Sequence, residues 1–363
     1  MRHEVPVEII DPFLFVERDG QTFVLTNRLE CDRIAAVLPG ATLALMDDLG
    51  LFDLIDDGMS RTEAELEVVI RAVAQWDVRA AAVAPDLPVQ VADRLRAEGV
   101  QLTVDPVEIE RRRRVKTPAE LAGIRRALRA AEAGIAAGEH LIRCAERVDG
   151  RLRHDGEPLT AEMVRHAVRS ACAALGAPAP PDIVVASALS GGGHDPGSGP
   201  LPADLPITID VWPRDETSGC CADMARTFVA GQTSAEVALI AAVVREALEA
   251  ARAGARAGTT GRAVYDLAAQ VIEDAGFPTQ RTRQPGVPLT TGFSFSLGHG
   301  VGLEVHEPPG LGLAGGQTLV AGDVVAIEPG VDGLEHIGGV MFEDLLLITD
   351  DGCETLTQFA YDL

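Results

Sequence analysis

The stretch Gly298-His299-Gly300-Val301-Gly302-Leu303-Glu304-Val305-His306-Glu307 decides which fold and which chemistry we expect of this chain. It places two histidines in a glycine-rich turn, and strand-like segments before and after it carry carboxylates. Four carboxylates and the imidazole of His299 in such settings indicate a metal site with oxygen-rich ligation. The four acidic positions are Asp210, Asp223, Glu328 and Glu343.

The charge of this ligand set predicts how many cations it holds. With the four carboxylates ionised and His299 neutral, two divalent cations balance the ligands. Without metal, converging carboxylates repel one another and raise their own pKa values. Two cations about 3.5–4 Å apart can share a water and lower its pKa toward neutrality, which gives a hydroxide able to attack an amide carbonyl. We therefore predict hydrolysis at a site for manganese, cobalt, iron or zinc, with manganese favoured.

Composition excludes several classes of function. The chain has 363 residues, enough for two domains, and a formal charge of -24 that repels nucleic acid and anionic membranes. We expect a small peptide partner, no nucleic acid and no membrane. The only basic run, 111–114, is interpreted as a solvated linker. Lys116 is the only lysine, which excludes a Walker A phosphate loop and disfavours a Schiff-base cofactor.

Cellular location is predicted from segments and cysteines. No run of apolar residues reaches membrane-spanning length, and the N-terminus lacks the apolar core of a signal peptide. The six cysteines show neither zinc-finger spacing nor the density of a disulfide scaffold. We expect reduced thiols and a cytoplasmic protein.

The first part of the chain alternates between strand and helix patterns. Ser60 and Glu63 have capping-box spacing at a helix start, and 80–84 has the composition of a buried strand. This alternation predicts a small α/β domain. Strands are expected at 13–17, 22–25, 80–84 and 100–104, and a helix at 88–98.

The second part begins with a strong helix signal. Thr117-Pro118-Ala119-Glu120 combines an N-cap, a proline at the first helical position and a capping box, and its helix should reach about residue 146. Because no regular βαβ repeat follows, we predict an α+β domain with an antiparallel sheet. A hairpin should bring Asp210 and Asp223 to one face. Further helices are expected at 160–176, 234–253 and 260–276, and strands at 183–187, 206–212, 224–229 and after 292.

These motifs together resemble the pita-bread metallopeptidases, which include methionine aminopeptidase, aminopeptidase P and Xaa-Pro dipeptidase. The resemblance spans about residues 115–360. It implies a creatinase-like N-terminal domain at 1–114 and a catalytic domain at 115–363, in which helices flank a curved antiparallel sheet. It also implies a homodimer.

The resemblance assigns roles to individual residues. The metal ligands would be the five residues named above, and Glu328 would also handle the proton of the attacking water. His306 would contact the substrate and stabilise the tetrahedral intermediate, and His194 would bind substrate near the metals. This chain departs from the family at Met341, where an arginine is common. The interval between the two aspartates is also longer, so the hairpin should bulge.

The leading prediction is a dinuclear exopeptidase that hydrolyses the N-terminal bond of peptides or dipeptides, with Xaa-Pro substrates favoured. Aminopeptidase and dipeptidase activity both remain open. The alternatives are a metal-free, creatinase-like amidinohydrolase and a non-catalytic peptide-binding module. Outside the site, Asp215, Glu216 and Glu335 are interpreted as solvated, and Cys220-Cys221 as packing residues.

Overall fold

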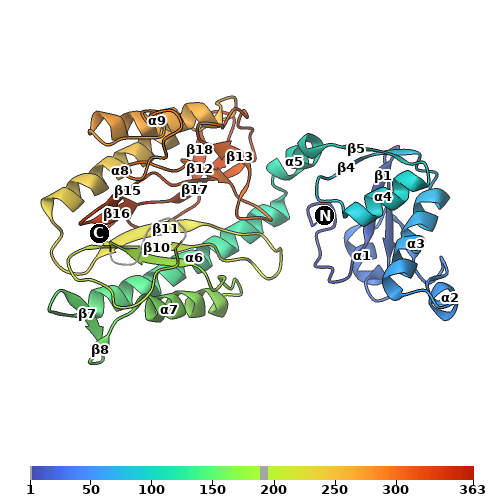
Figure 1. Cartoon of the computed structure of the whole chain (residues 1–363), viewed down its shortest axis with the longest axis horizontal. Helices are drawn as coiled ribbons and strands as arrows, with labels where there is room; N and C mark the ends of the chain where they lie inside the picture. Colours follow the sequence, from blue (N-terminus) through green and yellow to red (C-terminus); the bar gives the residue numbers. More distant parts are fainter. Residues whose placement is uncertain (1, 189–194) are drawn as a thin grey trace. The chain divides into compact units, whose positions relative to one another are not determined.

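The chain consists of two compact units, Met1–Arg113 and Arg114–Leu363, in a computed structural model that describes residues 2–188 and 195–363 (Figure 1). Each unit has buried hydrophobic clusters of its own. Among the described residues, no helix combines the length and the apolar character needed to cross a membrane.

The first unit has two small sheets with helices packed beside them. The predicted strands β1 and β2 form a hairpin, and β3 adds to β2 in parallel, while β4 and β5 form a separate parallel pair. The predicted capping box of Ser60 and Glu63 begins α3. The elements are β1 Leu14–Arg18, β2 Gln21–Thr26, α1 Cys31–Val37, β3 Thr42–Leu45, α2 Leu51–Asp56, α3 Arg61–Gln75, β4 Ala80–Val83, α4 Val89–Ala97, β5 Gln101–Val104 and α5 Pro106–Arg114.

The predicted burial of strand 80–84 is wrong. Ala80 and Ala82 are exposed, and Ala81 and Val83 are only half-buried. The strand belongs to a two-stranded sheet, so it lacks the second neighbour that would enclose it. An apolar run of this length does not distinguish an edge strand from a central one.

The solvated linker predicted at 111–114 is also wrong, because these residues end helix α5. Arg114 is largely buried within the second unit, where its guanidinium donates hydrogen bonds of 2.9 and 2.6 Å to the carboxylate of Asp323. It also donates to the carbonyl of Thr318 at 2.7 Å. Arg111, by contrast, is exposed and pairs with Glu108.

The second unit begins with the capping box of Thr117 and Glu120, as predicted, with Pro118 in the first turn of α6. Its elements are α6 Pro118–Cys144, β6 Glu146–Val148, β7 Arg151–His154, β8 Glu157–Pro158, α7 Ala161–Ala174, β9 Val184–Ser187, β10 Pro206–Val211, β11 Met224–Val229, α8 Ala235–Gly254, α9 Gly261–Asp274, β12 Gly298–Gly300, β13 Glu307–Leu311, β14 Val324–Ile327, β15 Gly330–Leu334, β16 Gly338–Met341, β17 Asp344–Ile348 and β18 Cys353–Thr355.

Helices cover the sheets of the second unit in two pairs. Helices α6 and α7 lie beside β10 and β11, whereas α8 and α9 cover the strands from the C-terminal part (Figure 1). Side chains alternate accordingly along β14, where Val324 and Ala326 join the first core and Val325 and Ile327 the second.

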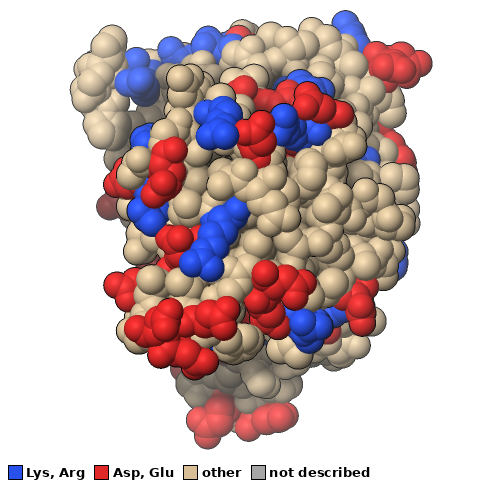
Figure 2. Space-filling model, turned by 90° about the vertical axis from the view of Figure 1, so that its right-hand side faces the viewer, with Lys and Arg blue, Asp and Glu red and all other residues tan. Residues whose placement is uncertain are grey.

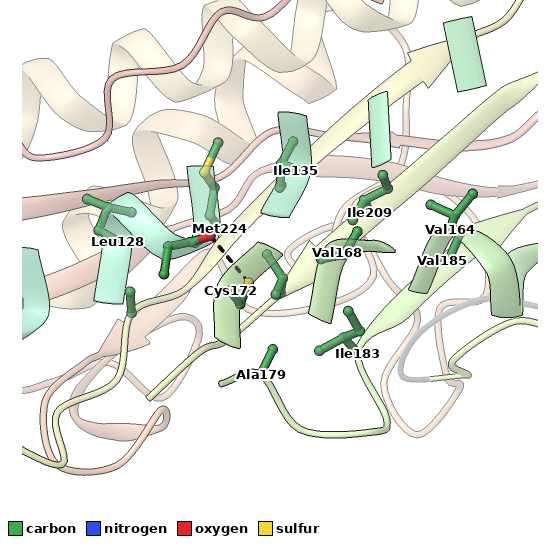
Figure 3. Close-up of a cluster of buried hydrophobic side chains, with 14 of the residues drawn as sticks. Leu128, Ile135, Val164, Val168, Cys172, Ala179, Ile183, Val185, Ile209 and Met224 are labelled. Carbon is green, nitrogen blue, oxygen red and sulfur yellow. Dashed lines mark hydrogen bonds between the residues drawn. The ribbon is translucent and has the colours of Figure 1, made fainter. Parts of the chain in front are cut away.

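The first core contains side chains from both helices and from the sheet (Figure 3). Ile135 of α6, Val168 of α7 and Ile209 of β10 pack together without solvent exposure. Cys172 donates a hydrogen bond of 3.2 Å from its thiol to the carbonyl of Ala130, which ties α7 to α6.

The strands around these two cores pair antiparallel, in the orders β11-β10-β9, β13-β12-β14-β17-β18 and β15-β16. The predicted α+β class is therefore confirmed. This arrangement brings the ends of β10, β11, β12, β14 and β17 close to one another.

Candidate metal centre

A β-hairpin brings Asp210 and Asp223 together, as the sequence predicts. In the β10–β11 register Asp210 lies opposite Ala225, and Asp223 is two positions before Ala225. Because side chains alternate along a strand, both carboxylates project from the same face. Ile209, directly before Asp210 on β10, points to the opposite face and is fully buried in the first core.

The loop that joins these two strands depends on Asp215, and the prediction that this residue is solvated is wrong. Asp215 is 3% exposed and accepts two hydrogen bonds from Arg126, at 2.9 and 2.8 Å. It also accepts from the backbone NH and the hydroxyl of Ser218. Burial by itself would raise the pKa of Asp215, but these donors outweigh it and lower the pKa to about 2. Glu216 and Glu335 are exposed, as predicted.

His299 lies in the middle of the short strand β12, between two glycines that the packing requires. A Cβ on Gly298 would lie 1.9 Å from the carbonyl oxygen of Ala326, and one on Gly300 would lie 2.3 Å from that of Pro308. Only glycine lets the neighbouring backbones approach so closely. The glycines flanking His299 therefore serve strand packing.

Hydrogen bonding orients the imidazole of His299. Its Nδ1 lies 3.1 Å from the carbonyl oxygen of Gly300, which can only accept, so Nδ1 carries the proton. In the neutral ring Nε2 then keeps its lone pair. This Nε2 lies 3.6 Å from both Asp223 Oδ2 and Glu328 Oε1.

Glu328 and Glu343 come together at one end of the β14–β17 pair. Ile327 lies opposite Asp344, so the next positions outward are Glu328 and Glu343. The backbone NH of Glu343 donates to Ala225 at 3.1 Å, which links this end of the pair to β11.

The predicted ligand atoms converge. One ligand atom each from Asp210, Asp223 and Glu343 lie within 4.8 Å of one another, and the same holds for Asp223, His299 and His306. Together with the contact between His299 and Glu328, these groups join all five predicted ligands into one cluster. The predicted substrate-binding residue His194 lies outside the described residues.

Desolvation by burial disfavours the ionised form of these carboxyl groups when no counter-charge is bound. It raises the pKa of Asp210 to about 7. The pKa values of Asp223, Glu328 and Glu343 also lie well above the ordinary range, first because of desolvation and then because of the neighbouring carboxylates.

Two carboxylate oxygens of the cluster are buried without a donor. Among the described residues, Asp210 Oδ1 and Glu343 Oε1 have no hydrogen-bond partner. Buried acceptors are nearly always satisfied, so such oxygens need an explanation, and a bound cation is one. An acceptor-rich cluster of this kind fits hard or borderline divalent cations.

His306 lies beside the cluster and is more exposed than its members. Its ring centroid is 4.2 Å from that of His299, and the two planes are nearly perpendicular at 80°. Both histidines line a cavity of about 660 Å³, together with Asp210 and Glu328. The cavity is large enough for a short peptide next to the cluster.

Sequence reasoning missed two features, one in the lining of this cavity and one next to His306 in the chain. Asp332 also lines the cavity, but the β15–β16 register shifts between Val331 and Leu334, so alternation along the strand could not place it from the sequence. Glu307, which directly follows His306 in the chain, forms an ion pair with Lys116 in which each side chain is 3% exposed. The signal there was that Lys116 is the only lysine.

The chain belongs to metallopeptidase family M24, whose family model matches residues 122–350. The pita-bread fold expected from the sequence motifs is confirmed. The structure is similar over its whole length to Xaa-Pro dipeptidase from Bacillus anthracis, with a TM-score of 0.79 and 22% identity, covering 91% of that chain. It is also similar to the X-Pro aminopeptidase from Thermotoga maritima, with a TM-score of 0.72 and 22% identity, over 96% of this chain and 87% of that one.

A curated relative shows higher identity over a shorter segment. The Xaa-Pro dipeptidase of Pyrococcus furiosus is 34% identical over 141 residues, which are 39% of this chain. The match spans only 37% of that relative's length.

Proposed function

We propose that this protein is a metal-dependent exopeptidase that hydrolyses the N-terminal bond of Xaa-Pro peptides or dipeptides. The observation that carries the proposal is the convergence of Asp210, Asp223, His299, Glu328 and Glu343, with two orphaned carboxylate oxygens, beside a cavity. The name of the Pyrococcus furiosus relative and those of the similar structures support the choice of Xaa-Pro substrates.

In this proposal the five clustered residues hold two divalent cations. A dinuclear centre of this kind supplies a hydroxide nucleophile at neutral pH and polarises the scissile carbonyl. The ligand set and the charge balance both fit it, because burial raises the pKa values of Asp210 and Asp223 and bound cations would offset that cost of ionisation.

The remaining chemistry falls to protein side chains. Glu328 lies on the cavity side of the cluster, where its carboxylate can accept the proton of the attacking water and pass it to the leaving nitrogen. His306 is exposed to the cavity and can donate a hydrogen bond to the oxyanion that develops on the carbonyl. The Gly300 carbonyl keeps Nε2 of His299 directed toward the cluster.

The activity test compares two variants with the wild type. Wild-type protein supplied with Mn²⁺ or Co²⁺ should cleave Ala-Pro or an Ala-Pro-started tripeptide. Asp223→Asn, which keeps the shape but removes the charge, should lower kcat/KM by about 10²–10³-fold, the scale of one lost electrostatic group at a catalytic centre. Glu335→Gln removes an exposed charge and should retain activity. Cleavage of these peptides by chelated wild type at full rate would contradict the proposed metal dependence.

We also propose manganese as the working ion, a homodimer and a cytoplasmic location. All six cysteines have free thiols, which supports a reducing compartment. The face drawn in Figure 2 shows acidic and basic side chains interspersed. With the net charge of -24, this supports a small peptide as partner in place of nucleic acid or membrane. Light scattering on the purified protein tests the dimer, and metal analysis after expression tests the ion.

A further inference from the structure

The β15–β16 hairpin gives the cavity a wall that the metal cluster does not use. Gly330 lies opposite Met341, and Val331 opposite Val340. The side chains of the two valines are buried in the second core. Met341, Asp332 and Gly330 line the cavity.

Tight packing fixes the position of this wall. The hydroxyl of Thr227 accepts from the backbone NH of Met341 and donates to its carbonyl, both at 3.0 Å. A Cβ on Gly330 would come within 2.8 Å of Phe295 and 3.3 Å of Met341. A Cβ on the facing Gly339 would come within 2.6 Å of Asp332 Oδ1. Met341 and Asp332 are therefore held in place in the lining of the cavity.

Apart from the two histidines, the charged side chains that line the described part of the cavity are all acidic. Among the described lining residues the charged side chains are Asp210, Glu328 and Asp332, and none is Lys or Arg. Asp210 and Glu328 belong to the proposed metal centre, so Asp332 is the carboxylate left to act on a substrate. A substrate carboxylate placed in this cavity would meet a like charge and an apolar thioether, and both disfavour its ionised form.

We propose that Asp332 and Met341 make the cavity discriminate against a free carboxylate near the scissile bond, so that peptides of three or more residues are preferred over dipeptides. The inference rests on the proposed exopeptidase function and specifies its substrate class. In a longer peptide a neutral amide occupies the place of the dipeptide's terminal carboxylate, and it carries no charge for Asp332 to repel.

A matched pair of substrates isolates this charge. Ala-Pro and its amide, Ala-Pro-NH₂, have nearly the same size and differ in the terminal carboxylate. With Mn²⁺-loaded protein we expect kcat/KM for the amide to exceed that for the acid by about tenfold or more. Ala-Pro-Ala should behave like the amide. Binding should show the same preference. Calorimetry with analogues of both dipeptides whose scissile bond is reduced, and which therefore cannot be cleaved, should give a Kd for the acid about tenfold or more above that for the amide.

Two variants test the residues, and a third controls for net charge. Met341→Arg should bring the ratio to unity or reverse it, and the nearly isosteric Asp332→Asn should reduce it. Glu335→Gln adds the same single unit of charge on the same hairpin but at an exposed position, so it should leave the ratio unchanged.

An acid equal to or better than the amide in the wild type would overturn the inference while leaving the proposed function intact. Equal shifts of the ratio in all three variants would also overturn it, because they would show a general charge effect. Failure to cleave any of the substrates would instead overturn the proposed function, and the Kd ratio of the reduced-bond analogues would still decide the inference.

Discussion

Asp215 holds the loop between two carboxylates of the metal centre, so its contribution to stability can be measured apart from catalysis. Asp215→Asn removes the charge that Arg126 and Ser218 bind, and we expect unfolding free energy at pH 7 to fall by about 1–3 kcal/mol. Glu216→Gln, an exposed position in the same loop, should change it by less than about 0.5 kcal/mol. Urea unfolding of the three proteins is the measurement.

The pH dependence of that difference has a defined sign. The folded-state pKa of Asp215 is lowered to about 2, below the unfolded value of about 3.9. Its contribution is therefore present above the unfolded pKa and is lost as pH falls through the folded one. The gap between wild type and Asp215→Asn should shrink between about pH 4 and pH 2. A gap that widens on acidification would contradict the assigned contacts.

The Lys116–Glu307 pair next to His306 is a second residue-scale test. Breaking a buried pair leaves one charge uncompensated, which costs about 3–5 kcal/mol. Lys116→Met and Glu307→Gln should each destabilise the protein on that scale, and the double variant by clearly less than their sum. The exposed pair Arg125–Glu354 is the control, and its removal should cost about 0–1 kcal/mol. Additive effects at Lys116 and Glu307 would show that the pair does not couple them.

At the scale of elements, β12 depends on glycine at position 298. Gly298→Ala places a methyl group against the Ala326 carbonyl, which must move, so we expect a loss of at least about 2 kcal/mol and weaker metal binding at His299. Gly310→Ala on the neighbouring strand β13 has open space at its Cβ and should be nearly neutral for stability. Thermal unfolding with metal titration separates the two variants, and a neutral Gly298→Ala would refute the packing argument.

Elements were predictable where their signals are local in sequence. The capping boxes at Ser60 and Thr117 lie within four residues of each helix start, and the structure shows both. The burial of Arg114 and Asp215 was missed because their partners, Asp323 and Arg126, are 209 and 89 residues away. No local pattern specifies such contacts.

The candidate site follows the same rule. Asp210 and Asp223 could be placed together because a hairpin joins their strands. Asp332 could not be placed in the cavity from sequence, because the β15–β16 register shifts between Val331 and Leu334. The same holds for helix α5. A run of four arginines in the sequence does not show whether it forms a solvated linker or the end of a helix.

At the scale of the whole molecule, the carboxylate cluster should make stability depend on metal and pH together. The folded-state pKa values of its members are raised, that of Asp210 to about 7. In the metal-free protein the contribution of Asp210 is therefore fully present below about pH 4 and is lost as pH rises through about 7, and the other members shift in the same direction. Scanning calorimetry should show that Mn²⁺ raises Tm more at pH 8 than at pH 5. An increment independent of pH would contradict the cluster's electrostatics.

The central claim is that Asp210, Asp223, His299, Glu328 and Glu343 bind a pair of divalent cations. Anomalous diffraction from crystals grown with Mn²⁺ tests it most directly. We predict two anomalous peaks about 3.5–4 Å apart, each within coordination distance of these side chains. Peaks elsewhere in the protein, or an empty cluster at saturating Mn²⁺, would contradict the account.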